Sequence, residues 1–123
     1  MADSERAKRG NEMRKRLFGD MPVPSETFKR LSEVTVEHLF GDIWTRPGLA
    51  VRDRSLITCA VLTALGREPQ LRIHMKGALN VGISREEILE MMVHIAHYAG
   101  WPTAVNGTHV AEAVFKEIDE ADG

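Results

Sequence analysis

A helix-length run of residues, 49–65, is nearly all apolar in its middle and limits what this chain can fold into. The run lies between Pro47-Gly48 and Gly66, residues that end helices more often than they continue them. A helix that is apolar on most sides is buried on most sides, so we expect residues 49–65 to form a deeply buried helix that ends at Gly66. The apolar residues at the centre of the run are Leu56, Ile57, Cys59, Ala60, Val61, Leu62, Ala64 and Leu65.

Helical signals also occur on both sides of this run. Residues 4–18 predict a charged helix, and Ser25 is a suitable N-cap for a second helix that Gly41 and then Arg46-Pro47-Gly48 bring to an end. Pro69 suits the first turn of a fourth helix, which we expect to stop at residues 80–82. The second helix has a broad apolar side, which consists of Phe28, Leu31, Val34, Leu39, Phe40 and Ile43.

The clearest start of a helix is at Ser84. Glu87 follows three residues later, which is the spacing of a capping box, in which each side chain bonds the backbone N–H of the other residue. Ile83 and Ile88 are placed to form the hydrophobic staple that accompanies such a start.

This fifth helix is predicted to run to Tyr98, and Pro102 can open a sixth that ends near Ile118. No stretch alternates apolar and polar residues convincingly, so we predict no strand and an all-α fold of about six helices. The 123 residues suit a single domain, 1–123. Within it we expect a basic N-terminal helix in residues 1–20 and an acidic, frayed tail at residues 119–123.

Composition excludes several classes of protein. The net charge of -2 gives no general attraction to nucleic acid or to a membrane surface. Cys59 is the single cysteine, so the chain can form neither an internal disulfide nor a four-cysteine zinc site. The N-terminus is charged and has no signal-peptide core, and no apolar run approaches the ~20 residues of a membrane span. We therefore expect a cytoplasmic protein.

His74 lies in the fourth predicted helix beside small residues. Gly77 and Ala78 are on the same face at helical spacing, and Gly77 costs about 1 kcal/mol of helix propensity relative to alanine. A helix that accepts this cost needs room there, either for a ligand or for a second helix that crosses closely. The local pattern leaves both interpretations open.

Three arginines flank the entry to the apolar run: Arg46, Arg52 and Arg54. A guanidinium presents a planar fork of donors that matches a carboxylate, so the three side chains could converge on an anion. The alternative is that they are solvated and only their stems are buried.

The other reactive residues give weaker evidence for a functional site. Glu90, His94 and His97 share a helix face and suit zinc or iron as ligands, but their spacing matches no strong metal motif, so we predict no metal. Cys59 lies in an apolar helix, and we interpret it as a small core residue. The chain has no glycine-rich phosphate loop and no nucleophile elbow.

Taken together, residues 40–107 closely resemble the carboxymuconolactone decarboxylase family. The resemblance is carried by FGDIWTRPGL, RDRSLITCAVLTALGR, QLRIHMKGALNVGISREEILEMM and HIAHYAGWPTAVNG, in one ordered run. It implies an all-helical, cofactor-free protein that assembles as a ring, a homohexamer or trimer, with active sites near subunit contacts. The family's namesake converts 4-carboxymuconolactone to the β-ketoadipate enol-lactone and CO2 during protocatechuate degradation, and the resemblance implies this activity here.

The redox branch of the same superfamily carries a Cys-x-x-Cys-x-x-x-His motif on the corresponding helix. Arg67 and Gln70 stand at the cysteine positions here, and only His74 remains. This branch also carries a glutamate early on the preceding helix, and Ser55 stands at the corresponding position here. Peroxidatic thiol chemistry through that motif is therefore excluded.

The resemblance implies roles for the candidate residues. His74 would be the general acid or oxyanion donor. The resemblance thus favours a pocket as the explanation for the small residues beside His74. His94, supported by Glu90, is the second catalytic candidate. The remaining candidates would bind substrate: Arg46, Arg52 and Arg54 as the carboxylate clamp, and Trp44, Tyr98 and Trp101 as the walls.

Family resemblance does not determine the substrate, because function resides in the site and not in the fold. The chain could instead be a decarboxylase or isomerase of a related carboxylated lactone. A different possibility is a non-catalytic helical ring that binds a small acid. In either case we expect a small-molecule partner and a homo-oligomer, because the third and fifth helices are apolar on more sides than a six-helix monomer can cover.

Overall fold

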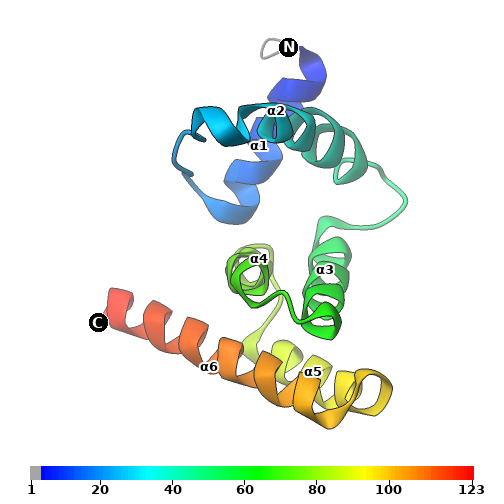
Figure 1. Cartoon of the computed structure of the whole chain (residues 1–123), viewed down its shortest axis with the longest axis vertical. Coiled ribbons are helices and arrows are strands. Elements are labelled where there is room, and N and C mark those ends of the chain that lie inside the picture. The colour runs from blue at the N-terminus through cyan, green and yellow to red at the C-terminus, as the bar shows by residue number, and fades with distance from the viewer. Residues whose placement is uncertain (1–3) are drawn as a thin grey trace.

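A computed structural model describes residues 4–123, and within that range all regular structure is helical, which confirms the all-α prediction (Figure 1). No helix in this range is both long enough and apolar enough to cross a membrane. The elements in chain order are α1 (Glu5–Phe18), the 3-10 turn η1 (Glu26–Phe28), α2 (Lys29–Val34), the π-helix η2 (Thr35–Ile43), α3 (Val51–Leu65), α4 (Glu68–Asn80), α5 (Arg85–Ala99) and α6 (Trp101–Asp122).

The helices form three layers along the long axis of the molecule. Figure 1 shows α1 and α2 with η2 at one end, α3 and α4 in the middle, and α5 and α6 at the other end. α3 packs on α4, α5 packs on α6, and α1 connects the first layer to the second by packing on both η2 and α4. The main buried core lies between α3, α4, α5 and α6 and contains Cys59, Leu71, Met75, Ile88, Met92, Ala111 and Val114.

The predicted helix end at Gly66 and the predicted helix start at Ser84 are confirmed. Gly66 caps α3 in the left-handed conformation, with φ 71° and ψ 30°. The Ser84 hydroxyl accepts a hydrogen bond from the Glu87 N–H, and the Glu87 carboxylate accepts one from the Ser84 N–H, both at 3.0 Å. Ile83 and Ile88 are both buried, as expected of a hydrophobic staple.

The second helix differs from the prediction. It begins with a 3-10 turn, the Ser25 side chain makes no capping bond, and the segment from Thr35 is wound as a π-helix. Gly41 does not end the helix, since it lies inside η2, where it faces α1. The π winding is completed by the bond of 2.9 Å from the Trp44 N–H to the carbonyl five residues earlier, at Leu39, and so sets where Trp44 sits.

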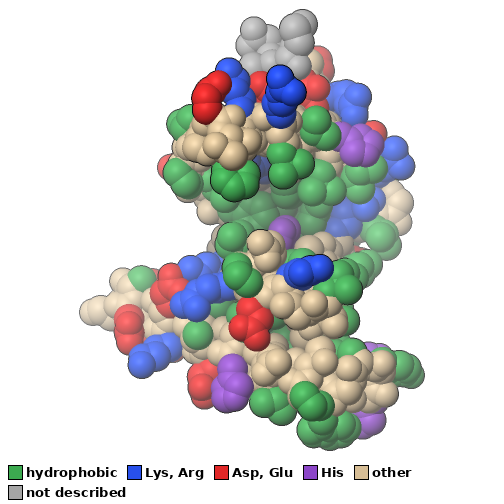
Figure 2. All heavy atoms as spheres, in the orientation of Figure 1, with side chains coloured by type: hydrophobic (Ala, Val, Ile, Leu, Met, Phe, Trp, Pro, Cys, Tyr) green, Lys and Arg blue, Asp and Glu red, His purple; other side chains and the backbone are tan. Residues whose placement is uncertain are grey.

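Burial of the two apolar helices is only partial in the single chain. α3 buries Ser55, Cys59 and Thr63 towards the core, but Ile57, Val61 and Leu65 are 49%, 49% and 61% exposed. The prediction that α3 is buried on most sides is therefore wrong within one chain. The apolar side of the second helix is also largely uncovered: Phe28, Leu31 and Val34 are exposed, whereas Phe40 is buried. Figure 2 shows hydrophobic side chains gathered over the N-terminal layer and around the junction of α5 and α6.

The C-terminal helix continues past its predicted end near Ile118. It reaches Asp122, and Arg85 forms two hydrogen bonds, of 3.2 and 2.6 Å, with the Asp119 carboxylate in the segment for which we expected fraying. Two residues earlier, Glu117 accepts hydrogen bonds from Arg72 and Lys76 of α4. These contacts tie α6 to α4 and α5.

Two glycines allow α1 and η2 to cross with their backbones in contact. A Cβ atom at Gly10 would overlap the carbonyl oxygen of Val36, and one at Gly41 would overlap the carbonyl oxygen of Arg6. Both obstacles are backbone atoms, which cannot move aside unless the helices separate.

We therefore expect Gly10→Ala to lower the free energy of unfolding by about 2 kcal/mol, because overpacking outweighs the ~1 kcal/mol that alanine gains in helix propensity. Denaturant unfolding followed by circular dichroism measures the change. Gly48→Ala is the matched control, since a Cβ atom there meets nothing within 4 Å. Equal stability of the two variants would contradict the close crossing.

Candidate active site

His74 lies half-buried on α4 between two aromatic side chains from other elements. Its ring centroid is 5.1 Å from that of Phe18, with the planes nearly perpendicular, and 6.4 Å from that of Trp44, with the planes 22° apart. Trp44 is buried in a small cluster with Met13, Leu17 and Phe40. The structure thus brings together two of the predicted site residues, Trp44 and His74, and adds Phe18, which the sequence analysis did not select.

Gly77 is explained by this aromatic environment. A Cβ atom at Gly77 would lie 3.0 Å from Cε1 of Phe18, so the glycine admits the Phe18 ring one turn from His74. The Asn80 side chain donates a hydrogen bond of 2.7 Å to the Leu17 carbonyl beside it. Of the two interpretations of this small residue, the single chain shows the close helix crossing, and the pocket next to His74 stays a prediction.

Polar groups without partners gather near the same cluster. Among the described residues, the buried side-chain atoms that lack a hydrogen bond are Arg54 Nε, Ser55 Oγ and His74 Nδ1. Val51, one turn before Ser55, packs against the Trp44 cluster, and the His74 ring contacts the same cluster. Because buried polar groups are nearly always hydrogen-bonded, unpaired groups in one region mark it as a place where other polar atoms bind.

Burial also sets the charge of His74. It lowers the pKa of the imidazole below its ordinary value of 6.5. In the free protein at neutral pH the ring is therefore uncharged, with one N–H donor and one acceptor nitrogen. Such a ring can donate a hydrogen bond to a developing negative charge or relay a proton.

The three predicted clamp arginines have different surroundings. Arg46 donates through Nε and Nη2 to the two carboxylate oxygens of Asp42, both at 3.2 Å, and this pairing lowers the pKa of Asp42. Arg52 forms an ion pair with Glu87, whose pKa it lowers. Arg54 donates to the Arg46 carbonyl at 3.1 Å and has no carboxylate partner within residues 4–123. Arg54 is therefore the arginine best placed to receive an anion.

The other predicted site residues lie elsewhere in the single chain. His94 is on the outer face of α5, stacked on Tyr98 with ring centroids 5.0 Å apart, and Trp101 contacts His97. Tyr98 and Trp101 are 80% and 61% exposed. α5 packs on α3 and α6, whereas His74 faces α1 and the Trp44 cluster. One chain therefore does not bring His94, Tyr98 or Trp101 to His74.

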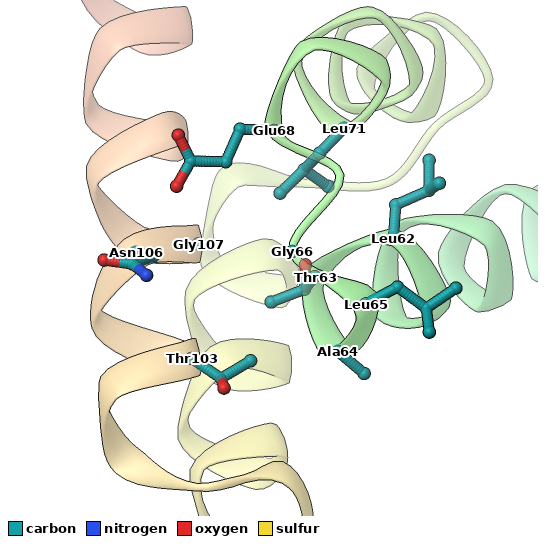
Figure 3. A pocket seen from close by; sticks show the side chains of 10 residues that line it. All are labelled: Leu62, Thr63, Ala64, Leu65, Gly66, Glu68, Leu71, Thr103, Asn106 and Gly107. Atoms are coloured by element: carbon teal, nitrogen blue, oxygen red, sulfur yellow. The ribbon is translucent and has the colours of Figure 1, made fainter.

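His94 does line a surface groove of about 440 Å³. Glu90 lies beside it, and the floor is apolar and comes from α3 and α5. A separate pocket of about 270 Å³ lies at the turn between α3 and α4, where Glu68, Thr103 and Asn106 border it (Figure 3). The sequence analysis selected none of the residues of this second pocket.

Cys59 is buried in the core, and burial raises the pKa of its thiol to about 12. The thiolate needed for nucleophilic attack is thus strongly disfavoured, which confirms its interpretation as a core residue. In the stretch from residue 4 to residue 123, no three His, Cys, Asp or Glu side chains gather into a possible metal site.

The low pKa of His74 predicts a pH dependence of stability. As pH falls below 6.5, the unfolded chain takes up a proton at this position before the folded protein does, so the contribution of His74 to stability is complete above 6.5 and is lost towards lower pH. We expect His74→Gln to reduce the fall in the free energy of unfolding between pH 8 and pH 5. Denaturant titrations at several pH values measure it. His109→Gln, which removes an exposed histidine on α6, is the control, and identical pH profiles for wild type and His74→Gln would contradict the prediction.

Comparison with known proteins identifies the family. The model of the carboxymuconolactone decarboxylase family matches residues 30–113. The 4-carboxymuconolactone decarboxylase of Acinetobacter baylyi is 37% identical over 125 residues, which cover 96% of this chain and 92% of that protein. Nitrosuccinic acid decarboxylase npaB of Metarhizium robertsii is 31% identical over 70% of this chain and 60% of its own length, and an uncharacterized 15.0 kDa protein of Paracoccus denitrificans is 33% identical over 82% and 77%. With a family match over most of its length and a relative that aligns almost from end to end, this chain belongs to the carboxymuconolactone decarboxylase family.

Proposed function

We propose that this protein decarboxylates 4-carboxymuconolactone to the β-ketoadipate enol-lactone and CO2, without a cofactor, in the cytoplasmic degradation of protocatechuate. The observation that carries the proposal is the alignment with the Acinetobacter baylyi 4-carboxymuconolactone decarboxylase, which is 37% identical and covers more than nine tenths of both chains. The fungal relative is also named as a decarboxylase, but of nitrosuccinic acid. Decarboxylation of a different carboxylated substrate is therefore the second candidate.

The chemistry explains why no cofactor is needed. The departing carboxylate is attached to a ring carbon of the lactone, and when its C–C bond breaks the electron pair spreads through the ring to the lactone carbonyl. CO2 leaves, and a proton is then added to carbon to give the enol-lactone. The protein has to hold the second carboxylate, stabilise the oxyanion that develops at the carbonyl, and supply the proton.

The surroundings of His74 and Arg54 support their assignment to these tasks. A neutral His74 donates a hydrogen bond from its N–H to the developing oxyanion, and preorganised donors of this kind contribute several kcal/mol to catalysis. Arg54, which alone of the three candidate arginines has no carboxylate partner within the described residues, holds the second carboxylate. Phe18 and Trp44 flank the imidazole and keep water from it.

Two variants test these roles. We expect His74→Gln to lower kcat by at least ~100-fold, because the amide cannot transfer a proton and does not reproduce the position of the imidazole N–H, and Arg54→Lys mainly to raise KM, because it loses the two-point contact. Loss of 4-carboxymuconolactone and release of CO2 measure both. Arg72→Lys is the control, since Arg72 is on the same helix as His74 but pairs with Glu117 of α6. Wild-type turnover by folded His74→Gln would remove His74 from the mechanism, and inactive wild-type protein would remove the proposed reaction.

We further propose that the protein is a homo-oligomer, a hexamer or trimer, whose neighbouring copies complete the site. Ile57, Val61 and Leu65 recur every four residues and form an uncovered apolar stripe along α3, beside the apolar groove that His94 lines. A stripe of this kind on a soluble protein favours contact with another chain. A neighbouring copy seated there is a way to bring His94, Tyr98 or Trp101 of one chain to His74 of another.

Light scattering tests the assembly. We expect wild-type protein to have a multiple of the 13.8 kDa chain mass and Val61→Glu to have a lower mass, because a carboxylate buried in an apolar contact is strongly unfavourable. Val23→Glu is the control, since Val23 is 92% exposed and outside the α3 stripe. A monomeric wild type at micromolar concentration would contradict the proposal.

A further inference from the structure

Ser55 is unusual among the hydroxyl residues of the helices. Each of four helical threonines donates its hydroxyl proton to the carbonyl four residues earlier, at 2.7 or 2.8 Å: Thr35, Thr58, Thr63 and Thr108. Ser55 lies between two of them in sequence and is completely buried, yet its Oγ has no partner within the described chain. A buried hydroxyl without a hydrogen bond costs about 1–3 kcal/mol, so its position calls for an explanation.

A complementary unpaired atom lies on the facing helix. Nδ1 of His74 is also buried and without a partner. In a neutral imidazole with its proton on Nε2, Nδ1 is an acceptor, whereas a serine hydroxyl is a donor. The two groups therefore have the chemistry to satisfy each other.

Ser55 and His74 lie on helices that pack against each other and that border the same cluster. α3 and α4 are joined by the short turn at Gly66 and are in contact. Val51, one turn before Ser55 on α3, packs against the Trp44 cluster, and the His74 ring of α4 is stacked on Trp44 itself.

We infer that Ser55 is a positioning residue, whose hydroxyl is linked to Nδ1 of His74 by one bridging water molecule, which accepts a hydrogen bond from the hydroxyl and donates one to the ring nitrogen. This bond holds the imidazole in the tautomer with its proton on Nε2, so that the Nε2–H is directed to the substrate. The bond acts on the ring whatever acid is bound, but the benefit to catalysis rests on the proposed decarboxylation. In many histidine sites the bond at one ring nitrogen sets the role of the other in this way.

Arg54 is the competing donor, since its Nε–H is also buried and unpaired. Its guanidinium is directed towards the loop before α3 by the bond from Nη2 to the Arg46 carbonyl. The assignment to Ser55 therefore requires a test that separates these neighbouring residues.

The test compares Ser55→Ala, Arg54→Lys and Thr63→Val by 15N NMR of the histidine side chains, with the His74 signals assigned from their loss in His74→Gln. We expect Ser55→Ala alone to move the Nδ1 resonance towards that of an imidazole nitrogen without a hydrogen bond. Thr63→Val is the matched control because it removes a buried hydroxyl from the same helix. An unchanged Nδ1 signal in Ser55→Ala, or a change in Arg54→Lys instead, would overturn the assignment.

Kinetics and stability complete the test. We expect Ser55→Ala to lower kcat on the order of 10-fold with KM within twofold, and to leave the melting temperature unchanged or higher, whereas Thr63→Val retains activity. A marked fall in the melting temperature of Ser55→Ala with unchanged kcat would show a purely structural hydroxyl. The NMR measurement needs no substrate. An inactive wild-type protein would therefore contradict the proposed decarboxylation, but the hydrogen bond at Nδ1 could still be tested by NMR.

Discussion

The contact between the end of α1 and the face of α4 is the interaction on which the rest of the structure depends. The N-terminal layer meets the helical bundle mainly through α1, and the contact combines the Phe18 ring against Gly77 with the hydrogen bond from Asn80 to Leu17. Phe18 then forms one wall of the environment of His74. The same packing that joins the two parts of the chain therefore also removes water from the candidate catalytic residue and lowers its pKa.

Two glycines, each packed against a backbone carbonyl of the other helix, make this contact possible. Gly10 and Gly41 let α1 and η2 touch along their backbones, so that α1 is held rigidly when it reaches α4. The π winding of η2 ends at Trp44 and presents its ring to His74 from the other side. π-Helical turns occur frequently at functional sites, and here the turn sets the position of an aromatic wall.

The proposed chemistry and the proposed assembly of this family member both involve α3. One face of the helix carries Ser55 and Cys59 towards the core, and the opposite face leaves Ile57, Val61 and Leu65 uncovered. In a redox relative a glutamate and a cysteine pair would serve peroxide chemistry in this region, whereas this chain has Ser55, Arg67 and Gln70. A serine hydroxyl can donate and accept hydrogen bonds but, unlike a carboxylate, is not ionised and is not a base, which agrees with the proposed reaction, in which there is no redox step.

By itself the sequence determined that the chain is helical, the helix ends at Gly66 and Ser84, and the family. Gly66, Ser84 and Glu87 act through neighbours within five residues, so their effect is visible without any tertiary contact, and the same holds for the absence of the cysteine motif at Arg67 and Gln70. Only the tertiary structure decided why Gly77 is small, because the atom that excludes a side chain there comes from Phe18, far away in the chain. It also separated Arg54 from Arg52, since Glu87, which pairs with Arg52, lies 35 residues away in sequence. The pair of Arg46 with Asp42 is local, because the two residues are four positions apart. Contacts and ion pairs between residues far apart in sequence depend on how the helices pack. Helical periodicity predicts which faces of a helix are apolar, but not which other helix covers them.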